Sequence, residues 1–103
     1  MQFKQVFVLS AALLLAGNAV ADEALFKKST CSACHNVNKK VVGPALKDIA
    51  AKYAGDTTAQ ARLVAKIRSG GKGVWGPVGM PAAPKSVSDE DLNTLVSWIL
   101  SMK

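Results

Sequence analysis

Cys31-Ser32-Ala33-Cys34-His35 contains both cysteines and the single histidine of this 103-residue chain. The C-x-x-C-H spacing is typical of covalent haem attachment. Two thiols at this spacing can add across the two vinyl groups of one porphyrin edge, and the adjoining imidazole then faces the iron. The pentapeptide therefore predicts one haem c, bound through thioethers by Cys31 and Cys34 and ligated at the iron by His35.

Three other kinds of site use the same residue types. A thiol–disulfide redox pair of thioredoxin type needs βαβ units, which the sequence does not indicate. A structural zinc site takes four protein ligands, commonly from two separated pairs, and this chain has one pair and one histidine. A structural disulfide is sterically feasible, but it gives the histidine no role and leaves a small core. We favour haem attachment because it uses all three residues.

Residues 1–21 are typical of a cleaved secretory signal. An apolar run at 6–16 follows the cation Lys4, and Ala19-Val20-Ala21 provides a small-x-small cleavage site. A membrane anchor is the alternative, but the run is shorter than the roughly 20 apolar residues that span a bilayer. We predict cleavage before Asp22 and export to the periplasm, an oxidising compartment, with no stable membrane insertion afterwards.

The predicted mature domain, 22–103, has 82 residues with 12 basic and 7 acidic side chains, and hence a net charge of +5. Two ionised haem propionates would lower this charge to +3. Moderate positive charge favours docking on acidic surfaces of partner proteins. The basic residues are dispersed and belong to no nucleic-acid-binding motif, so we expect no nucleic-acid partner. Because 82 residues form only a small core, we expect the haem to complete that core. The protein without haem is therefore expected to be poorly ordered.

Apolar periodicity predicts helices at 23–30, 45–54 and 58–69, and a last helix that begins after Ser88. Ser88 can cap that helix, and its apolar stripe consists of Leu92, Leu95, Val96 and Ile99. No strand is predicted. Residues 71–87 contain four glycines and three prolines and are predicted to form a loop. A disordered linker is the alternative, but the apolar side chains of this segment favour an ordered loop.

A second axial ligand can come from Met80, Met102 or a lysine. A thioether is soft and uncharged, so it stabilises ferrous iron and raises the reduction potential. Met80 lies in the Gly/Pro-rich loop, 45 residues after His35, and such a loop can cover the far face of a haem. Methionines more often fill gaps in a core, a role that suits Met102. We favour Met80 as the ligand.

Matching segments in order along 22–103 resemble the small class I bacterial cytochromes c of the c-551 and c-552 type. These segments are Leu25-Phe26-Lys27-Lys28, Cys31-x-x-Cys34-His35, Val42-Gly43-Pro44-Ala45, Asp48-Ile49-Ala50-Ala51-Lys52-Tyr53, Gly73-Val74-Trp75-Gly76-Pro77, Met80-Pro81, Val87-Ser88-Asp89 and Trp98-Ile99-Leu100-Ser101. The resemblance implies an all-α class I cytochrome c fold, with four or five short helices around one covalently bound haem. It also implies that the terminal helices cross.

The resemblance further implies roles for three residues. The Pro44 carbonyl would accept a hydrogen bond from Nδ1–H of His35, which fixes the tautomer and makes the ligand more basic. Trp75 would donate its indole N–H to a haem propionate, and Lys66 would lie near the same group. The alternatives are an ordinary core residue for Trp75 and a solvated helix residue for Lys66. Relatives of this type can carry an asparagine after Met-Pro, where this chain has Ala82 and Ala83.

These features predict a monomeric one-electron carrier of the periplasm and no enzyme activity. The resemblance points to respiratory or denitrification partners, such as the bc1 complex as donor and a nitrite reductase, terminal oxidase or peroxidase as acceptor. The alternative is a haem enzyme or gas sensor whose sixth ligand is labile.

Overall fold

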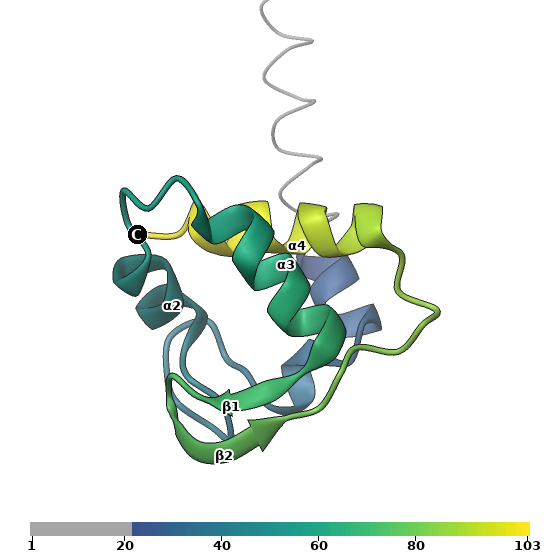
Figure 1. Cartoon of the computed structure of the whole chain (residues 1–103), viewed down its shortest axis with the longest axis horizontal. Coiled ribbons are helices and arrows are strands. Elements are labelled where there is room, and N and C mark those ends of the chain that lie inside the picture. The colour runs from purple at the N-terminus through teal and green to yellow at the C-terminus, as the bar shows by residue number, and fades with distance from the viewer. Residues whose placement is uncertain (1–21) are drawn as a thin grey trace, which may run out of the picture.

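The computed structural model describes residues 22–103, and the predicted signal peptide at 1–21 lies outside the described residues (Figure 1). Residues 22–28 are helical. The elements that follow are η1 (Cys31–Ala33), α2 (Leu46–Lys52), α3 (Ala59–Ser69), β1 (Gly71–Gly73), β2 (Gly76–Met80) and α4 (Asp89–Leu100). Within 22–103, no helix is long and apolar enough to cross a membrane.

Helix α4 forms the centre of the core, as its apolar stripe predicts. The Ser88 hydroxyl accepts a hydrogen bond from the backbone N–H of Asp91 at 3.1 Å and caps the helix. The most deeply buried residues of the stripe are only 1% exposed; they are Leu92, Leu95 and Val96. Ile99 is partly buried. Burying side chains of this size contributes about 1.5–3 kcal/mol each, so α4 supplies much of the apolar stabilisation.

The other helices pack around α4. Both α2 and α3 contact it, and Leu46 of α2 is 1% exposed against the same cluster. The helical segment at 22–28 reaches α4 through Phe26, whose ring centroid lies 5.6 Å from that of Trp98. The N-terminal and C-terminal helical segments therefore meet, as the resemblance implies.

The helix ends agree with the sequence to within a few residues. Helix α2 is shorter than the predicted 45–54, and α3 begins one residue after Thr58. Helix α3 ends where the Gly70-Gly71 pair predicts: Gly70 has φ of 72°, and its N–H donates to the Lys66 carbonyl at 2.7 Å. A positive φ at this position favours glycine.

A short antiparallel hairpin replaces part of the predicted loop at 71–87. Strands β1 and β2 pair Gly71 with Met80 and Gly73 with Gly76. Their side chains are mostly exposed, so no alternation of apolar and polar residues marks them in the sequence. Two glycines with φ of 116°, Gly73 and Gly76, flank the two-residue turn. The expectation that the domain lacks strands was wrong in this segment, although the fold remains all-α in class.

Candidate haem-binding site

The two cysteines and the histidine lie on one helical turn. Backbone N–H groups of Cys34 and His35 both donate to the Cys31 carbonyl, at 3.2 and 3.0 Å. Residues three and four apart on such a turn share one face, which explains the C-x-x-C-H spacing. Just before the turn, Thr30 has φ of 66°, a backbone conformation that few residues other than glycine adopt. The chain thereby turns from the helical segment at 22–28 into η1.

No disulfide joins Cys31 and Cys34 in the structure. Burial raises the pKa of the Cys31 thiol above its usual range. A catalytic cysteine of a thiol oxidoreductase needs the opposite shift, because the thiolate is the nucleophile. Within 22–103, no group of three or more histidine, cysteine or acidic side chains could hold a metal ion. The described residues therefore favour neither a thiol redox site nor a zinc site.

His35 is oriented by the loop that follows it. The loop turns back so that the Gly43 N–H donates to the Cys34 carbonyl at 2.7 Å. As a result, the Pro44 carbonyl oxygen lies 2.8 Å from His35 Nδ1. A carbonyl can only accept, so Nδ1 carries the proton and Nε2 keeps the lone pair that a metal ion needs. The structure thus contains the contact between His35 and Pro44 that the resemblance implies.

Gly43 is a positioning residue whose role the sequence did not reveal. A Cβ at this position would lie 2.5 Å from His35 Cε1 and 2.9 Å from Nδ1. Only glycine lets the imidazole pack this closely on the loop. The Val-Gly-Pro-Ala run of the resemblance was the available signal, but it does not say which atom needs the space.

We expect Gly43→Ala to destabilise the protein by about 1–3 kcal/mol, because the added methyl group overpacks the imidazole. It should also raise the reduction potential, since a weaker bond to Pro44 makes the imidazole a poorer electron donor to iron. Denaturant unfolding and redox titration measure both effects. Gly55→Ala is the control: φ is 78° there but nothing lies within 4 Å, so only stability should fall. Equal potentials in the wild type and Gly43→Ala would contradict the prediction.

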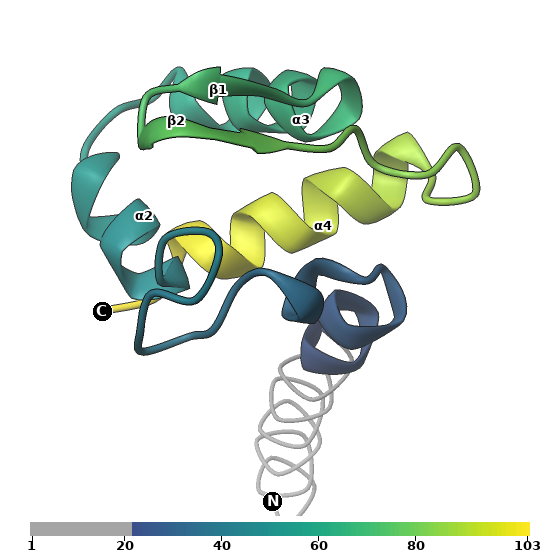
Figure 2. The same ribbon diagram turned by 90° about the horizontal axis from the view of Figure 1, so that it is seen from below.

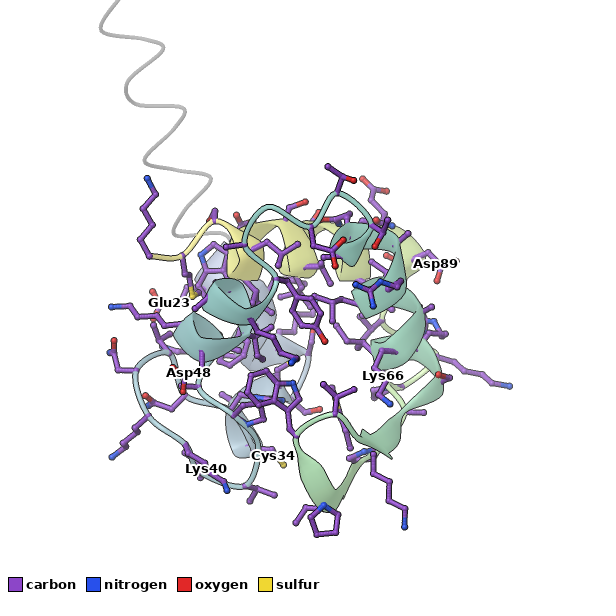
Figure 3. The ribbon with its side chains drawn as sticks, turned by 60° about the vertical axis from the view of Figure 1, so that its left-hand side comes forward. Glu23, Cys34, Lys40, Asp48, Lys66 and Asp89 are labelled. Carbon is purple, nitrogen blue, oxygen red and sulfur yellow. The ribbon has the colours of Figure 1, made fainter. Side chains whose placement is uncertain are left out.

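All seven predicted site residues line one cavity of about 700 Å³; they are Cys31, Cys34, His35, Pro44, Lys66, Trp75 and Met80. In Figure 2 the β1–β2 hairpin lies along one side of the molecule and the segment around residues 31–45 along the opposite side. Cys34 and Lys66 lie on opposite sides of the cavity (Figure 3). Much of its wall is apolar and comes from Phe26, Leu46, Ile49, Leu63, Ile67, Val96 and Ile99.

The cavity fits the predicted cofactor. Its volume is in the range of roughly 300–1,000 Å³ that cofactor sites occupy. The apolar wall suits a flat macrocycle, and two thiols with an imidazole lie at one side. Cys31 and Cys34 would form the thioethers, and Nε2 of His35 would reach the iron.

Met80 lines the cavity from the end of strand β2. It was expected in an irregular loop, and this detail is corrected: pairing with Gly71 fixes its backbone. Met102, the rival thioether, packs partly buried against the core cluster and is not among the cavity-lining residues. Of Met80 and Met102, Met80 is therefore the one whose side chain lines the cavity with His35.

Lys66 and Trp75 both line the cavity, and each has its own surroundings. A Cβ on Gly71 would be 2.6 Å from Lys66 Nζ, so glycine at this position leaves room for the ammonium group. None of the ion pairs among residues 22–103 includes Lys66, which leaves its charge free for an anionic group. Trp75 is 45% exposed, and Lys52 Nζ lies 5.5 Å from its ring centroid.

Tyr53 and Arg62 are among the cavity-lining residues that the sequence did not single out as site residues. Tyr53 and Arg62 both contribute to the wall, and Arg62 Cζ lies 5.6 Å from the Tyr53 ring centroid. Arg62 also forms an ion pair with Asp56. Tyr53 ends a segment of the resemblance that implied no role for it, and Arg62 belongs to none of those segments. Their approach to the cavity depends on how α2 and α3 pack.

Residues 20–103 match the cytochrome c family. The chain belongs to the cytochrome c family. It is 49% identical over 98 residues to cytochrome c-551 of Pseudomonas aeruginosa, covering 93% of this chain and 92% of that protein. It is 54% identical over 94 residues to cytochrome c-552 of Nitrosomonas europaea, covering 91% and 90%. The crystal structure of wild-type Nitrosomonas europaea cytochrome c552 matches with a TM-score of 0.74 and 53% identity, over 79% of this chain and 99% of that chain.

Membership in the cytochrome c family confirms three predictions. The protein is a class I cytochrome c of the c-551/c-552 type. It carries one covalently bound haem c, and it is a monohaem electron carrier, not an enzyme.

Proposed function

We propose that this cytochrome carries single electrons in the periplasm with His35 and Met80 as the two axial ligands. The observation that carries the proposal is that both residues line the same apolar cavity, from segments 45 residues apart. When bound, the haem c supplies an iron that alternates between the ferric and ferrous states. Cys31 and Cys34 would hold the cofactor, and Lys66 and Trp75 would lie near its propionates.

The chain's own residues favour electron transfer over substrate chemistry. Pro44 holds the proton on Nδ1 of His35 at 2.8 Å, which keeps the imidazole oriented in both oxidation states. Met80 would occupy the opposite side and exclude added ligands. A similar set of ligands in both states keeps the reorganisation on electron transfer small. An enzyme or gas sensor would instead need Met80 to leave readily.

The rim of the cavity supports docking with acidic redox proteins. Lys40 and Lys72 line the same cavity and are exposed. Cations beside the cofactor site suit brief contact with an acidic partner, because charge speeds the encounter. Donors such as the bc1 complex and acceptors such as a nitrite reductase, terminal oxidase or peroxidase fit this role.

A redox spectrum with added ligands tests the proposal. We expect the ferric protein to show a Met-to-iron charge-transfer band at the red end of its spectrum, and to bind cyanide slowly. The ferrous protein should not bind carbon monoxide readily. A missing band together with fast binding of both ligands would favour the haem enzyme or gas sensor.

Export and oligomeric state are tested separately. The proposal expects the purified protein to begin at Asp22, to appear in the periplasmic fraction and to elute as a monomer. A retained N-terminal segment in the membrane fraction would contradict cleavage of residues 1–21.

A further inference from the structure

Residues 81–88, called the strap below, connect Met80 at the end of β2 to α4. The strap contains no helix or strand, and most of its residues are exposed (Figure 1). Ala82 and Ala83 offer no side-chain hydrogen bond. Segments with few buried contacts open locally at low free-energy cost, so the strap needs anchors from elsewhere to hold Met80 in place.

Arg68, in the last turn of α3, makes three hydrogen bonds to the strap and its end. Its guanidinium group donates to the Val87 carbonyl at 2.6 Å and to the Pro84 carbonyl at 3.3 Å. It also donates to the Asp89 carboxylate at 2.9 Å, and Figure 3 shows Asp89 beside α3. Among residues 22–103, no other side chain donates to a strap carbonyl. The planar fork of arginine suits this task, because one group can serve several acceptors at fixed angles.

The carbonyl contacts matter more than the ion pair. The Asp89 side chain is 83% exposed, and exposed ion pairs contribute about 0–1 kcal/mol. Val87 is only 8% exposed and belongs to the core cluster, so its carbonyl has less access to water. A charged donor to such a group contributes more than a neutral hydrogen bond.

Two other contacts from the end of α3 hold the part of the strap nearest Met80. The Ala83 N–H donates to the Ile67 carbonyl at 2.9 Å. Gly70 packs so closely that a Cβ would lie 2.6 Å from the Met80 carbonyl oxygen and 2.7 Å from the Ala82 nitrogen. Arg68 therefore fixes the far part of the strap, while the backbone of α3 fixes the near part.

We propose that Arg68 is a positioning residue for the sixth ligand: by holding the strap against α3, it slows the departure of Met80 from the iron. This role rests on the proposed ligation by Met80. Arg68 would support that ligation by holding the segment that adjoins Met80. Met80 directly precedes the strap, so opening of the strap frees Met80 to move, and each bond from Arg68 adds to the free energy of that opening.

The test compares Arg68→Gln with the wild type as complete haem-loaded proteins. Hydrogen exchange at the Ala83 and Val87 amides measures strap opening, and the rate of cyanide binding to the ferric protein measures departure of Met80. We expect both to rise at least about tenfold in Arg68→Gln, the factor that corresponds to losing one hydrogen bond to a charged group. The charge-transfer band should weaken as well.

Three matched variants separate strap anchoring from charge and from general stability. Lys85→Gln removes a cation from the exposed strap, and Lys85 belongs to no ion pair within 22–103. Gln60→Ala removes a link from α3 to α4, because Gln60 Nε2 donates to the Asn93 carbonyl at 2.9 Å. Asp89→Asn removes only the ion pair. We expect wild-type cyanide rates in the first two and a rise below threefold in the third.

Unchanged exchange and cyanide rates in Arg68→Gln would overturn the inference, as would an equal rise in Gln60→Ala. Arg68→Lys keeps the positive charge, so its exchange and cyanide-binding rates should lie between those of Arg68→Gln and the wild type. Wild-type rates in Arg68→Lys would overturn the role of the planar guanidinium group. A wild type without the charge-transfer band would contradict Met80 ligation itself. In that case the proposed role of Arg68 toward Met80 is also overturned, and the amide exchange still shows whether Arg68 anchors the strap.

Discussion

Met80→Ala is expected to lower the reduction potential by more than about 0.1 V and to open the iron to added ligands. Axial ligands set the potentials of haem proteins over a range of about 0.8 V, so loss of one thioether is a large change. A thioether favours ferrous iron, and its removal favours the ferric state. The charge-transfer band should disappear, and cyanide and carbon monoxide should bind quickly. Redox titration and absorption spectroscopy measure these effects.

Met102→Ala is the matched control, because Met102 packs against the core cluster instead of lining the cavity. It should keep the wild-type potential and spectrum. It should cost about 2 kcal/mol of stability, the lower end of methionine truncations in cores, because Met102 is only partly buried. If Met102→Ala lost the band and Met80→Ala kept it, the two assignments would be reversed.

The double variant Cys31→Ala/Cys34→Ala should lose covalent haem and most of its ordered structure. Nine apolar residues are buried within 22–103, and a cavity of about 700 Å³ lies beside them. Without the cofactor, the apolar cavity wall would face water, at about 25 cal/mol for each Å² left exposed. Net stabilities of domains are only about 5–15 kcal/mol, so we expect this exposed apolar surface to leave little ordered structure.

Haem staining of a denaturing gel and far-ultraviolet circular dichroism measure the two effects. Ser32→Ala is the matched control, because Ser32 lies between the cysteines and is exposed; it should keep both the stain and the helical signal. A colourless double variant with the full helical signal would show that the polypeptide folds without the cofactor.

The hairpin shows where the sequence failed to predict the fold. Helices carry a local signal, because apolar residues three and four apart mark a buried face and caps mark the ends. Most residues of strands β1 and β2 are exposed. Their pairing depends on glycines with positive φ and on contact with the rest of the domain. No local pattern reports such a pairing.

The sequence by itself determined the attachment motif, His35, the α4 stripe and the Ser88 cap. Each of these depends on residues within a few positions of one another, where spacing alone fixes geometry. The tertiary structure decided how His35 and Pro44, nine residues apart, form one hydrogen bond. It also decided that Arg68 reaches Val87, 19 residues away, and that Met80 and His35 share one cavity. Such contacts form only when separate segments pack on a common core. The spacing of residues along the chain does not predict that packing.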